Sequence, residues 1–332
     1  MKILIVTDAW FPQVNGVVRT LNTLKEGLEA QGHETKYITP DLFKTIPCPT
    51  YPEIRLALTK PGTIGKMIDD FEPNAIHIAT EGPLGTIANR HCRKRGYPFT
   101  TAYHTRFPEY IKPRFGIPLK WSYAMLRRFH GPSSAIMVAT QTIEDALAEN
   151  GFKNIRRWTR GVDTELFHPR PKDFLDFERP IQVYVGRVAI EKNIEAFLAL
   201  DTPGTKMVVG DGPQLESLKK KYPATQFVGM KKGEELAAHY AASDIFVFPS
   251  KTDTFGLVLL EAMASGLPVA AYPVPGPLDV VNQSGAGVLE DDLKKAVHEA
   301  LEIDPSVPRA YAEKFSWEAS VNQFLGNLDV FR

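Results

Sequence analysis

The sequence is poor in cysteine, carries no net charge and lacks any long hydrophobic run. Two cysteines, Cys48 and Cys92, fit neither a disulfide framework nor a zinc site, so we expect a reducing cytoplasm. No apolar stretch approaches the roughly 20 residues that cross a bilayer. The first ten residues are interrupted by Asp8, and no small-residue cleavage site follows them. We therefore expect no signal peptide.

Further absences narrow the chemistry. The loop after the first expected strand lacks the G-x-G-x-x-G pattern of a nicotinamide site, so a dehydrogenase is weakly supported. No recognised nucleic-acid-binding module is present. We find neither a carboxylate pair placed like the nucleophile and acid/base of a retaining glycosidase nor an aspartate pair typical of a divalent metal. The sequence therefore predicts no metal and no cofactor.

The composition is that of a globular protein, with 43% hydrophobic and 23% charged residues. A chain of 332 residues is long enough for two domains of ordinary size. The charges are divided unevenly, because residues 1–162 contain 22 Lys and Arg against 14 Asp and Glu, whereas the remainder contains 17 against 25. A basic half suits an acidic partner, an anionic membrane or nucleic acid; alternatively, the two halves are complementary in charge.

Short, mostly apolar β-branched runs alternate with helix-length stretches along the whole chain. Such runs are typical of buried parallel strands in βαβ units. The expected strands are Lys2–Thr7, Thr35–Thr39, Ala75–Ala79, Phe99–Tyr103, Ala135–Ala139, Ile181–Val185, Lys206–Val209, Gln226–Val228, Asp244–Phe248 and Val269–Tyr272. The pattern restarts near Ile181, after the Pro- and charge-rich segment His168–Pro180, which indicates a domain boundary. We expect an α/β protein with two doubly wound domains, whose ligands lie beyond the carboxyl ends of the strands.

The stretch SKTDTFGLVLLEAMASG, residues 250–266, reads as a loop that leads from a strand into a helix starting near Phe255 or Gly256. The first turn of a helix offers unpaired N–H groups and the positive end of the dipole, so it can hold a phosphate. Asp253 could accept hydrogen bonds from sugar hydroxyls, and Glu261 could reach a ribose. Alternatively, Asp253 is only a cap and Glu261 only a solvated helix residue.

Two more strand ends carry glycine. The stretch YVGRVAIEKN places Gly186 and Arg187 after a strand with Lys192 further on, and VVGDGPQ ends another strand. Arg187 and Lys192 could neutralise a diphosphate as it departs. Alone, they would read as a surface pair; three glycine-bearing strand ends in one domain favour a phosphate site.

Taken in order, PQVNGVVR, YHT, GVD, GR with EKN, GDGP and an acid-x7-acid helix resemble glycosyltransferase family 4. The resemblance covers essentially the whole chain. It implies a retaining, metal-independent enzyme of the GT-B fold, with two Rossmann-like domains facing across a cleft. We expect an acceptor-binding domain over residues 1–165, a nucleotide-sugar-binding domain over 166–310, and a C-terminal helix within 311–332 that crosses back to the first domain.

The resemblance also assigns roles in donor binding. It makes Arg187 and Lys192 the diphosphate clamp, Glu261 the ribose contact and Asp253, with the following amides, the sugar and phosphate contact. The other expected donor contacts are Gly16, Gly186, Gly229, Met230, Phe255, Gly256, Leu257 and Val258. The family usually has Glu at the position of Asp253, so the reach of this shorter acid to the sugar is open.

On the acceptor side the resemblance points to Asn15, Glu81 and His104. Asn15 and Gly16 open a helix after the first strand, where a plain turn is the alternative. Glu81 follows a strand and either binds the acceptor or caps a helix. His104 lines the acceptor side in the family, and its usual pKa near neutrality suits proton handling. The expected catalytic set is His104, Arg187, Lys192 and Asp253.

A basic stretch with aromatic neighbours indicates the acceptor. On a helix from about Leu119, the residues Lys120, Trp121, Arg127 and Arg128 suit an anionic bilayer surface. The alternative is an apolar core face with solvated charges. The residues of several stretches are similar to those of bacterial glycolipid (diacylglycerol) glycosyltransferases and of sulfoquinovosyl transferases. We therefore expect a peripheral enzyme at the inner face of the plasma membrane, which transfers hexose from a UDP-sugar to a lipid.

Two alternatives stay open. One is a GDP-mannose-dependent mannosyltransferase with a soluble or polyprenyl-linked acceptor. The other is a catalytically silent protein that binds nucleotide sugars, which the departure at Asp253 keeps in play.

Overall fold

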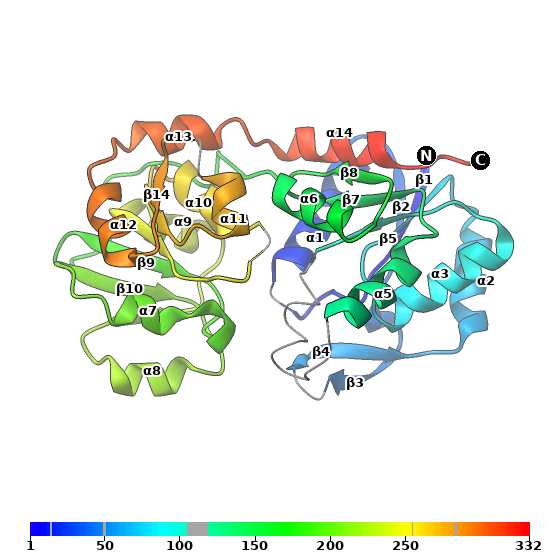
Figure 1. Cartoon of the computed structure of the whole chain (residues 1–332), viewed down its shortest axis with the longest axis horizontal. Helices are drawn as coiled ribbons and strands as arrows, with labels where there is room; N and C mark the ends of the chain where they lie inside the picture. The colour runs from blue at the N-terminus through cyan, green and yellow to red at the C-terminus, as the bar shows by residue number, and fades with distance from the viewer. Residues whose placement is uncertain (14, 49–50, 105–118, 254, 282–283) are drawn as a thin grey trace. The chain divides into compact units, whose positions relative to one another are not determined.

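The computed structural model describes residues 1–13, 15–48, 51–104, 119–253, 255–281 and 284–332. It divides into two compact units (Figure 1). Unit 1 comprises Met1–Arg160 together with Trp317–Arg332, and unit 2 comprises Gly161–Ser316.

Unit 1 is built on a six-stranded sheet in the order β2-β1-β5-β6-β7-β8, in which every pairing is parallel. Its strands are β1 (Lys2–Val6), β2 (Glu34–Ile38), β5 (Ala75–Ile78), β6 (Thr100–Ala102), β7 (Ala135–Val138) and β8 (Ile155–Arg157). The antiparallel pair β3 (Lys44–Cys48) and β4 (Tyr51–Leu58) forms a separate sheet. The helices are α1 (Gly16–Ala30), η1 (Pro40–Leu42), α2 (Pro61–Phe71), α3 (Pro83–Arg95), α5 (Leu119–His130), α6 (Gln141–Glu149) and α14 (Trp317–Asn327).

The C-terminal helix α14 is part of the core of unit 1 and packs against α1 (Figure 1). A Cβ added to Gly27 of α1 would lie 2.6 Å from Cγ2 of Val321, so the glycine permits this close approach. Phe324 is fully buried, with its ring centroid 5.0 Å from that of Trp158. The Oγ of Ser320 donates to the carbonyl of Thr159 at 2.7 Å.

Unit 2 is built on a second six-stranded parallel sheet, in the order β11-β10-β9-β12-β13-β14. Its strands are β9 (Ile181–Val185), β10 (Thr205–Val209), β11 (Gln226–Gly229), β12 (Ile245–Phe248), β13 (Val269–Ala271) and β14 (Gly287–Leu289). Its helices are η2 (Ile190–Lys192), α7 (Ile194–Leu198), α8 (Leu215–Lys221), α9 (Gly233–Ala242), α10 (Leu257–Ala264), α11 (Pro275–Val280), α12 (Leu293–Ala300) and α13 (Ser306–Ala312).

The central strands are buried along their length, which explains their continuous apolar sequence. All residues of β7, β9 and β12 are buried. Helices cover both faces of such sheets, so the side chains of these three strands do not reach water. Burying one Val, Leu or Ile side chain stabilises the fold by about 1.5–3 kcal/mol.

Each sheet has one place where the chain reverses its direction of winding. In unit 2 the chain moves outward from β9 through β10 to β11, and then returns to the other side of β9 to form β12. In unit 1 the reversal lies between β1 and β5. Loops at the carboxyl ends of the two strands part at such a point, and doubly wound proteins bind ligands there.

Candidate functional site

The two segments that follow β9 and β12, at the reversal point of unit 2, carry most of the predicted donor residues. Arg187 and Lys192 follow β9, and Asp253 follows β12. The Nζ of Lys192 lies 2.5 Å from Oδ1 of Asp253. The side chains are 22% and 20% exposed, so this ion pair is partly shielded from water. The structure thus brings together two residues that lie 61 positions apart in sequence.

Further hydrogen bonds fasten the same two loops. The Nδ2 of Asn193 donates to the carbonyl of Pro249 at 3.1 Å, and Oγ1 of Thr252 donates to the carbonyl of Glu191 at 3.2 Å. Asn193 adopts a left-handed backbone, which asparagine tolerates better than most residues. These contacts hold the Lys192–Asp253 pair in a fixed setting.

Asp253 retains an unused oxygen. Its Oδ2 atom is buried and has no hydrogen-bond partner among the residues that the structure describes. Leaving a buried acceptor without a partner is costly, by about 1–3 kcal/mol. The oxygen is therefore suited to accept a hydrogen bond from a ligand.

The start of α10 lies next to this acid. Its N-cap, Gly256, has φ +81° and contributes no side chain to the first-turn amides. A Cβ at this position would lie 3.1 Å from Cδ1 of Leu259, so both the backbone and the packing favour glycine. The expected helix start is confirmed to within two residues, because α10 begins at Leu257.

Arg187 and its glycine neighbours occupy the other loop. An Nη of Arg187 lies 3.9 Å from Oε1 of Glu191, at the limit of an ion pair. A Cβ at Gly210 would lie 1.9 Å from the carbonyl oxygen of Gly186, so the loops after β9 and β10 touch through their backbones. Close packing of two loops is thus a sufficient reason for glycine at these strand ends, independent of any ligand.

Glu261 is a buried residue of α10 and not the solvated one that the alternative interpretation required. It is 3% exposed, and its Oε2 accepts a hydrogen bond from the hydroxyl of Tyr240 at 3.1 Å. This bond links α10 to α9. Gly229 is the last residue of β11, and Met230 follows the strand. In the sheet, β10 lies between β11 and β9, so β11 is roughly 10 Å from β9 at the usual strand spacing.

At the reversal point of unit 1, Asp8 performs the capping role that the sequence suggested for Glu81. Its two oxygens accept from the N–H groups of Leu84 and Gly85 at 2.9 and 3.2 Å. Burial raises the pKa of Asp8, whereas these hydrogen bonds oppose the shift. Sequence reasoning missed Asp8, although its position directly after the first strand was a signal.

Glu81 instead contacts a buried histidine. Its Oε1 lies 3.1 Å from Nε2 of His130, whose Nδ1 lies 2.9 Å from Oγ1 of Thr101. Asn15 caps α1, since its Oδ1 accepts from the N–H groups of Val17 and Val18 at 3.0 Å each. The plain turn therefore accounts for Asn15 without a ligand, and Gly16 is the first residue of the helix.

His104 lies beside Arg160 in unit 1, with Nδ1 3.3 Å from Nη2 of the arginine. Burial and then the charge of Arg160 lower the pKa of His104 well below its usual value. The expected pKa near neutrality is therefore wrong, and the ring is neutral at physiological pH. The physical reason is that the site is both dry and cationic.

Helix α5 carries the expected membrane residues, with one correction. Trp121 is 73% and Met125 is 55% exposed, and Lys120 and Arg128 are exposed beside them. Arg127 is half-buried, and its guanidinium donates to the carbonyl of Asn150 at 2.8 Å. At 100° per residue it points away from the face of Trp121, so we remove it from the membrane set. Residues 111–118 of the basic stretch lie outside the described residues.

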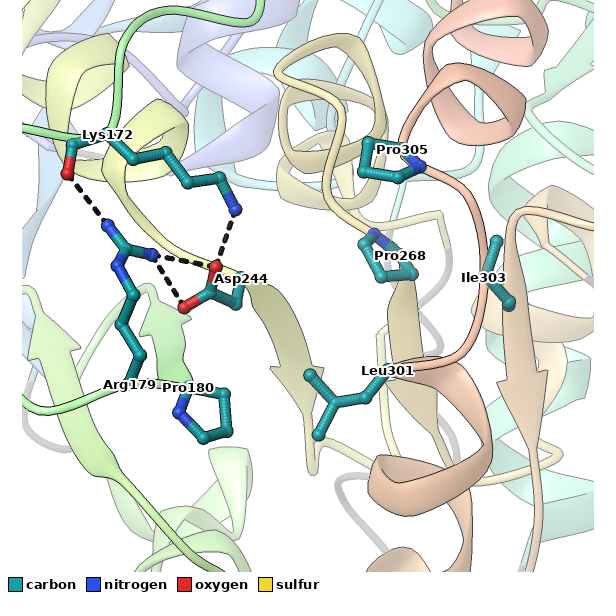
Figure 2. Close-up of a pocket in the computed structure, with 8 residues that line it drawn as sticks. All are labelled: Lys172, Arg179, Pro180, Asp244, Pro268, Leu301, Ile303 and Pro305. Atoms are coloured by element: carbon teal, nitrogen blue, oxygen red, sulfur yellow. Dashed lines mark hydrogen bonds and ion pairs between the residues drawn. The ribbon is translucent and has the colours of Figure 1, made fainter.

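A surface hollow in unit 2 lies at the opposite edge of the sheet, by the amino ends of β9, β12 and β13 (Figure 2). Lys172 and Arg179 converge there on Asp244, at 2.5 and 2.7 Å. Asp244 also accepts from the N–H of Ile181 at 2.7 Å, so it fastens the preceding segment to the sheet. Both cations have a carboxylate partner, and we assign the cluster a structural role.

In the described part of the chain, no helix has the length and apolar character needed to cross a membrane. The same residues include no group of three or more His, Cys, Asp or Glu side chains arranged to hold a metal ion.

Two family models match consecutive parts of the chain. The model described as Glycosyltransferase Family 4 matches residues 14–166, and the one described as Glycosyl transferases group 1 matches residues 170–311.

Three named relatives match most of the chain. A GDP-mannose-dependent alpha-mannosyltransferase of Mycobacterium tuberculosis is 28% identical and covers 100% of this chain and 97% of its own. The sulfoquinovosyl transferase SQD2 of Arabidopsis thaliana is 30% identical over 96% of this chain and 71% of its own. An alpha-monoglucosyldiacylglycerol synthase of Streptococcus pneumoniae is 28% identical over 98% and 83%, respectively.

Among solved structures, the sucrose-phosphate synthase of Thermosynechococcus elongatus superimposes with a TM-score of 0.74 at 22% identity, covering 98% of this chain and 97% of that one. At this identity the likeness concerns the fold. The prediction of an α/β protein of the GT-B class, with two Rossmann-like halves, is confirmed.

Proposed function

The chain belongs to glycosyltransferase family 4 and uses a nucleotide sugar as its donor; from this premise we propose that it transfers a hexose from a UDP-sugar to a lipid such as diacylglycerol. In this proposal the enzyme is retaining and needs no metal, and it works as a peripheral protein on the inner face of the plasma membrane. UDP-glucose and UDP-glucuronate are the donors that we favour.

The setting of Asp253 carries the proposal. One of its oxygens is bonded to Lys192, and the other is buried without a partner among the described residues. Next to it is a helix start, at Gly256, that no side chain of its N-cap covers. An acceptor for a sugar hydroxyl, a cation for a diphosphate and helix-start amides for its oxygens thus occur together. Glu261 and the backbone at Gly229 and Met230 are the proposed ribose and base contacts.

The proposed chemistry balances without a protein nucleophile. The bond between the anomeric carbon and the diphosphate oxygen breaks, and its electron pair stays on the leaving diphosphate. The acceptor hydroxyl oxygen bonds to the same face of that carbon, and its proton passes to the leaving phosphate oxygen. Arg187 and Lys192 stabilise the negative charge that develops in the transition state.

The lipid acceptor is supported by α5 and by one group of relatives. Trp121, Ala124, Met125 and Arg128 follow the i, i+3, i+4, i+7 spacing, so they form one exposed stripe with both aromatic and cationic members. Such a face suits an anionic bilayer surface. The Streptococcus pneumoniae relative is named for a diacylglycerol product.

A second candidate is a GDP-mannose-dependent mannosyltransferase. The observation that favours it is the Mycobacterium tuberculosis relative, which matches the full length of this chain and is named for that donor. A silent nucleotide-sugar-binding protein is less favoured, because Asp253 reaches Lys192 despite being shorter than the family's glutamate.

The test is a calorimetric titration with UDP-glucose, UDP-glucuronate, UDP-galactose and GDP-mannose, followed by transfer of labelled sugar to diacylglycerol in vesicles. We expect a UDP-sugar to bind and a labelled lipid to form. Binding of GDP-mannose alone would favour the second candidate, and binding without transfer to any acceptor would favour the silent protein. Lys220→Met, an exposed lysine on α8, is the matched control for Lys192→Met.

A further inference from the structure

Arg160 is a buried cation of unit 1 that the sequence motifs did not single out. It is 5% exposed, and its guanidinium lies 4.2 Å from the ring centroid of Trp158. Its Nη1 donates to the carbonyls of Trp158 and Thr159 at 2.5 and 3.2 Å. Burial lowers the pKa of Arg160 to about 9, so it is still a cation at neutral pH.

A further contact of this guanidinium determines which nitrogen of His104 carries a proton. Nη2 of Arg160 lies 3.3 Å from Nδ1 of His104. Arginine has donors and no acceptor, so Nδ1 must accept and has no proton of its own. A neutral imidazole that accepts at Nδ1 carries its proton at Nε2. Turning the ring over would place a carbon against the guanidinium and lose the bond.

The groups around His104 oppose a second proton. Besides Arg160, which follows β8, the groups that act on it are His77 of β5 and His130 of α5. His77 is itself fully buried, and burial lowers its pKa to about 3. The carboxylate of Glu81 contacts the far side of this cluster, at Nε2 of His130.

We propose that Arg160 is a positioning residue that locks His104 in the neutral Nε2–H form, so that His104 donates a hydrogen bond to a ligand and cannot take the proton of the acceptor hydroxyl. The identity of that ligand rests on the proposed function, whereas the state of the ring does not. In the transfer reaction, the acceptor proton then goes to the leaving phosphate oxygen and not to His104. This excludes His104 as a general base.

The first test is a long-range ¹H–¹⁵N NMR spectrum of the full chain labelled at histidine, recorded without ligand. The signals of His104 are assigned by their loss in His104→Gln. We expect a protonated Nε2 and an unprotonated Nδ1 that stay unchanged from about pH 8 to about pH 5.5, whereas an ordinary histidine would titrate near 6.5. A proton on Nδ1, or a doubly protonated ring at pH 7, would overturn the proposal. The spectrum needs no substrate, so its result is independent of whether the transferase proposal holds.

Two variants test the part played by Arg160. Arg160→Lys keeps a cationic donor and should keep the Nε2–H form. Arg160→Met should give a mixture of both tautomers and raise the pKa of His104 toward about 6.5. Signals of His104 identical in the wild type and the methionine variant would overturn the role of Arg160. If the methionine variant does not fold, the lysine variant and the wild-type spectrum decide.

The pH dependence of turnover gives a second readout. If the tautomer is locked, the pH profile of kcat should show the same ionisations in the wild type and in His104→Gln. Arg160→Met should lower kcat more than it changes the KM for the donor. A wild-type acid limb near pH 6.5 that is lost in His104→Gln would identify a base and contradict the proposal.

Discussion

The two units differ in the groups that contact a shielded cation. In unit 2 the cation Lys192 contacts the carboxylate of Asp253 directly. In unit 1 the cation Arg160 is bonded to backbone carbonyls and to a neutral imidazole. A buried guanidinium in such a setting loses its hydration without gaining a full countercharge. It therefore needs hydrogen-bond acceptors, and its charge lowers the pKa of the neighbouring histidine.

The Lys192–Asp253 pair should matter far more for transfer than for stability. A partly exposed ion pair contributes only about 1 kcal/mol to folding, because solvation and side-chain entropy offset the attraction. A cation placed on a departing diphosphate contributes about 100-fold or more to the rate. Lys192→Met should therefore lower kcat at least about 100-fold, with a change in unfolding free energy of about 1 kcal/mol or less.

Turnover and urea denaturation measure these two effects in the same preparation. Lys220→Met, which changes an exposed lysine of the same unit, should alter neither. A variant at Lys192 that unfolds, or that retains full turnover, would contradict the assignment.

His77 should make unit 1 sensitive to mild acid. Burial lowers its folded-state pKa to about 3, against about 6.5 when unfolded. Below about pH 6.5 the unfolded state therefore binds a proton at His77 that the folded state does not bind. The contribution of His77 to stability is fully present above about pH 6.5 and is lost as the pH falls toward 3. Between pH 7 and pH 5 this one group should lower the unfolding free energy by about 2 kcal/mol.

Urea denaturation followed by tryptophan fluorescence measures this loss. Trp10, Trp121, Trp158 and Trp317 all lie in unit 1, so the signal reports on that unit. In His77→Gln the dependence should be smaller by about 2 kcal/mol, even if the variant is less stable throughout. If the unfolding free energy depended equally on pH in both proteins, a different titrating group, and not His77, would cause the effect.

Among the elements, α5 combines a buried side with an open one. Tyr123 and Leu126 are buried in unit 1, whereas Trp121 and Met125 project from it. An exposed tryptophan on a basic helix is typical of an interfacial surface. The sequence predicted a basic helix with aromatic neighbours, but it grouped Arg127 with the other exposed cations and could not show that Arg127 bonds to Asn150.

This difference within α5 provides a matched pair of variants. Arg128→Glu reverses one exposed charge, and at about 1 kcal/mol for each unit of charge it should weaken binding to anionic vesicles by about 2 kcal/mol, or about 30-fold. Arg127→Met removes one hydrogen bond and should cost about 1 kcal/mol of stability. It should also weaken vesicle binding much less than Arg128→Glu.

Co-sedimentation with phosphatidylglycerol and with phosphatidylcholine vesicles separates these outcomes. Trp121→Ser should reduce binding to both kinds of vesicle. Binding that is the same for all three variants and the wild type would remove α5 from the lipid-binding proposal.

For the whole molecule, the sequence predicted the α/β class, and all ten expected strands are present. Most of these strands are buried, so their sequences are continuous apolar runs that can be recognised as strands without a structure. The unpredicted β8 has the sequence IRR, and β14 begins with glycine and has only three half-buried residues. The pair β3 and β4 lies outside the main sheet, and its exposed positions leave no continuous apolar run.

The candidate site was predictable where a motif names the residue, as for Lys192 and Asp253. It was not predictable where a role depends on burial or on a distant partner. The capping of α3 by Asp8 joins residues 76 positions apart, and Glu261 reads as a solvated helix residue until Tyr240 is placed beside it. Arg160 precedes the GVD motif directly, but no spacing rule indicates that it lies against His104.

The final prediction concerns the helix that closes the chain. Phe324 of α14 is fully buried against Trp158 and His77, at 5.0 Å from each ring centroid, so a sequence end supplies part of the core of unit 1. Truncating a buried phenylalanine costs about 3–5 kcal/mol, because the cavity collapses only partly. Phe324→Ala should therefore shift the tryptophan-detected unfolding of unit 1 by that amount. Glu318→Ala, on the exposed side of the same helix, should change it by less than about 0.5 kcal/mol. Equal small effects of the two variants would show that α14 is dispensable for this core in solution.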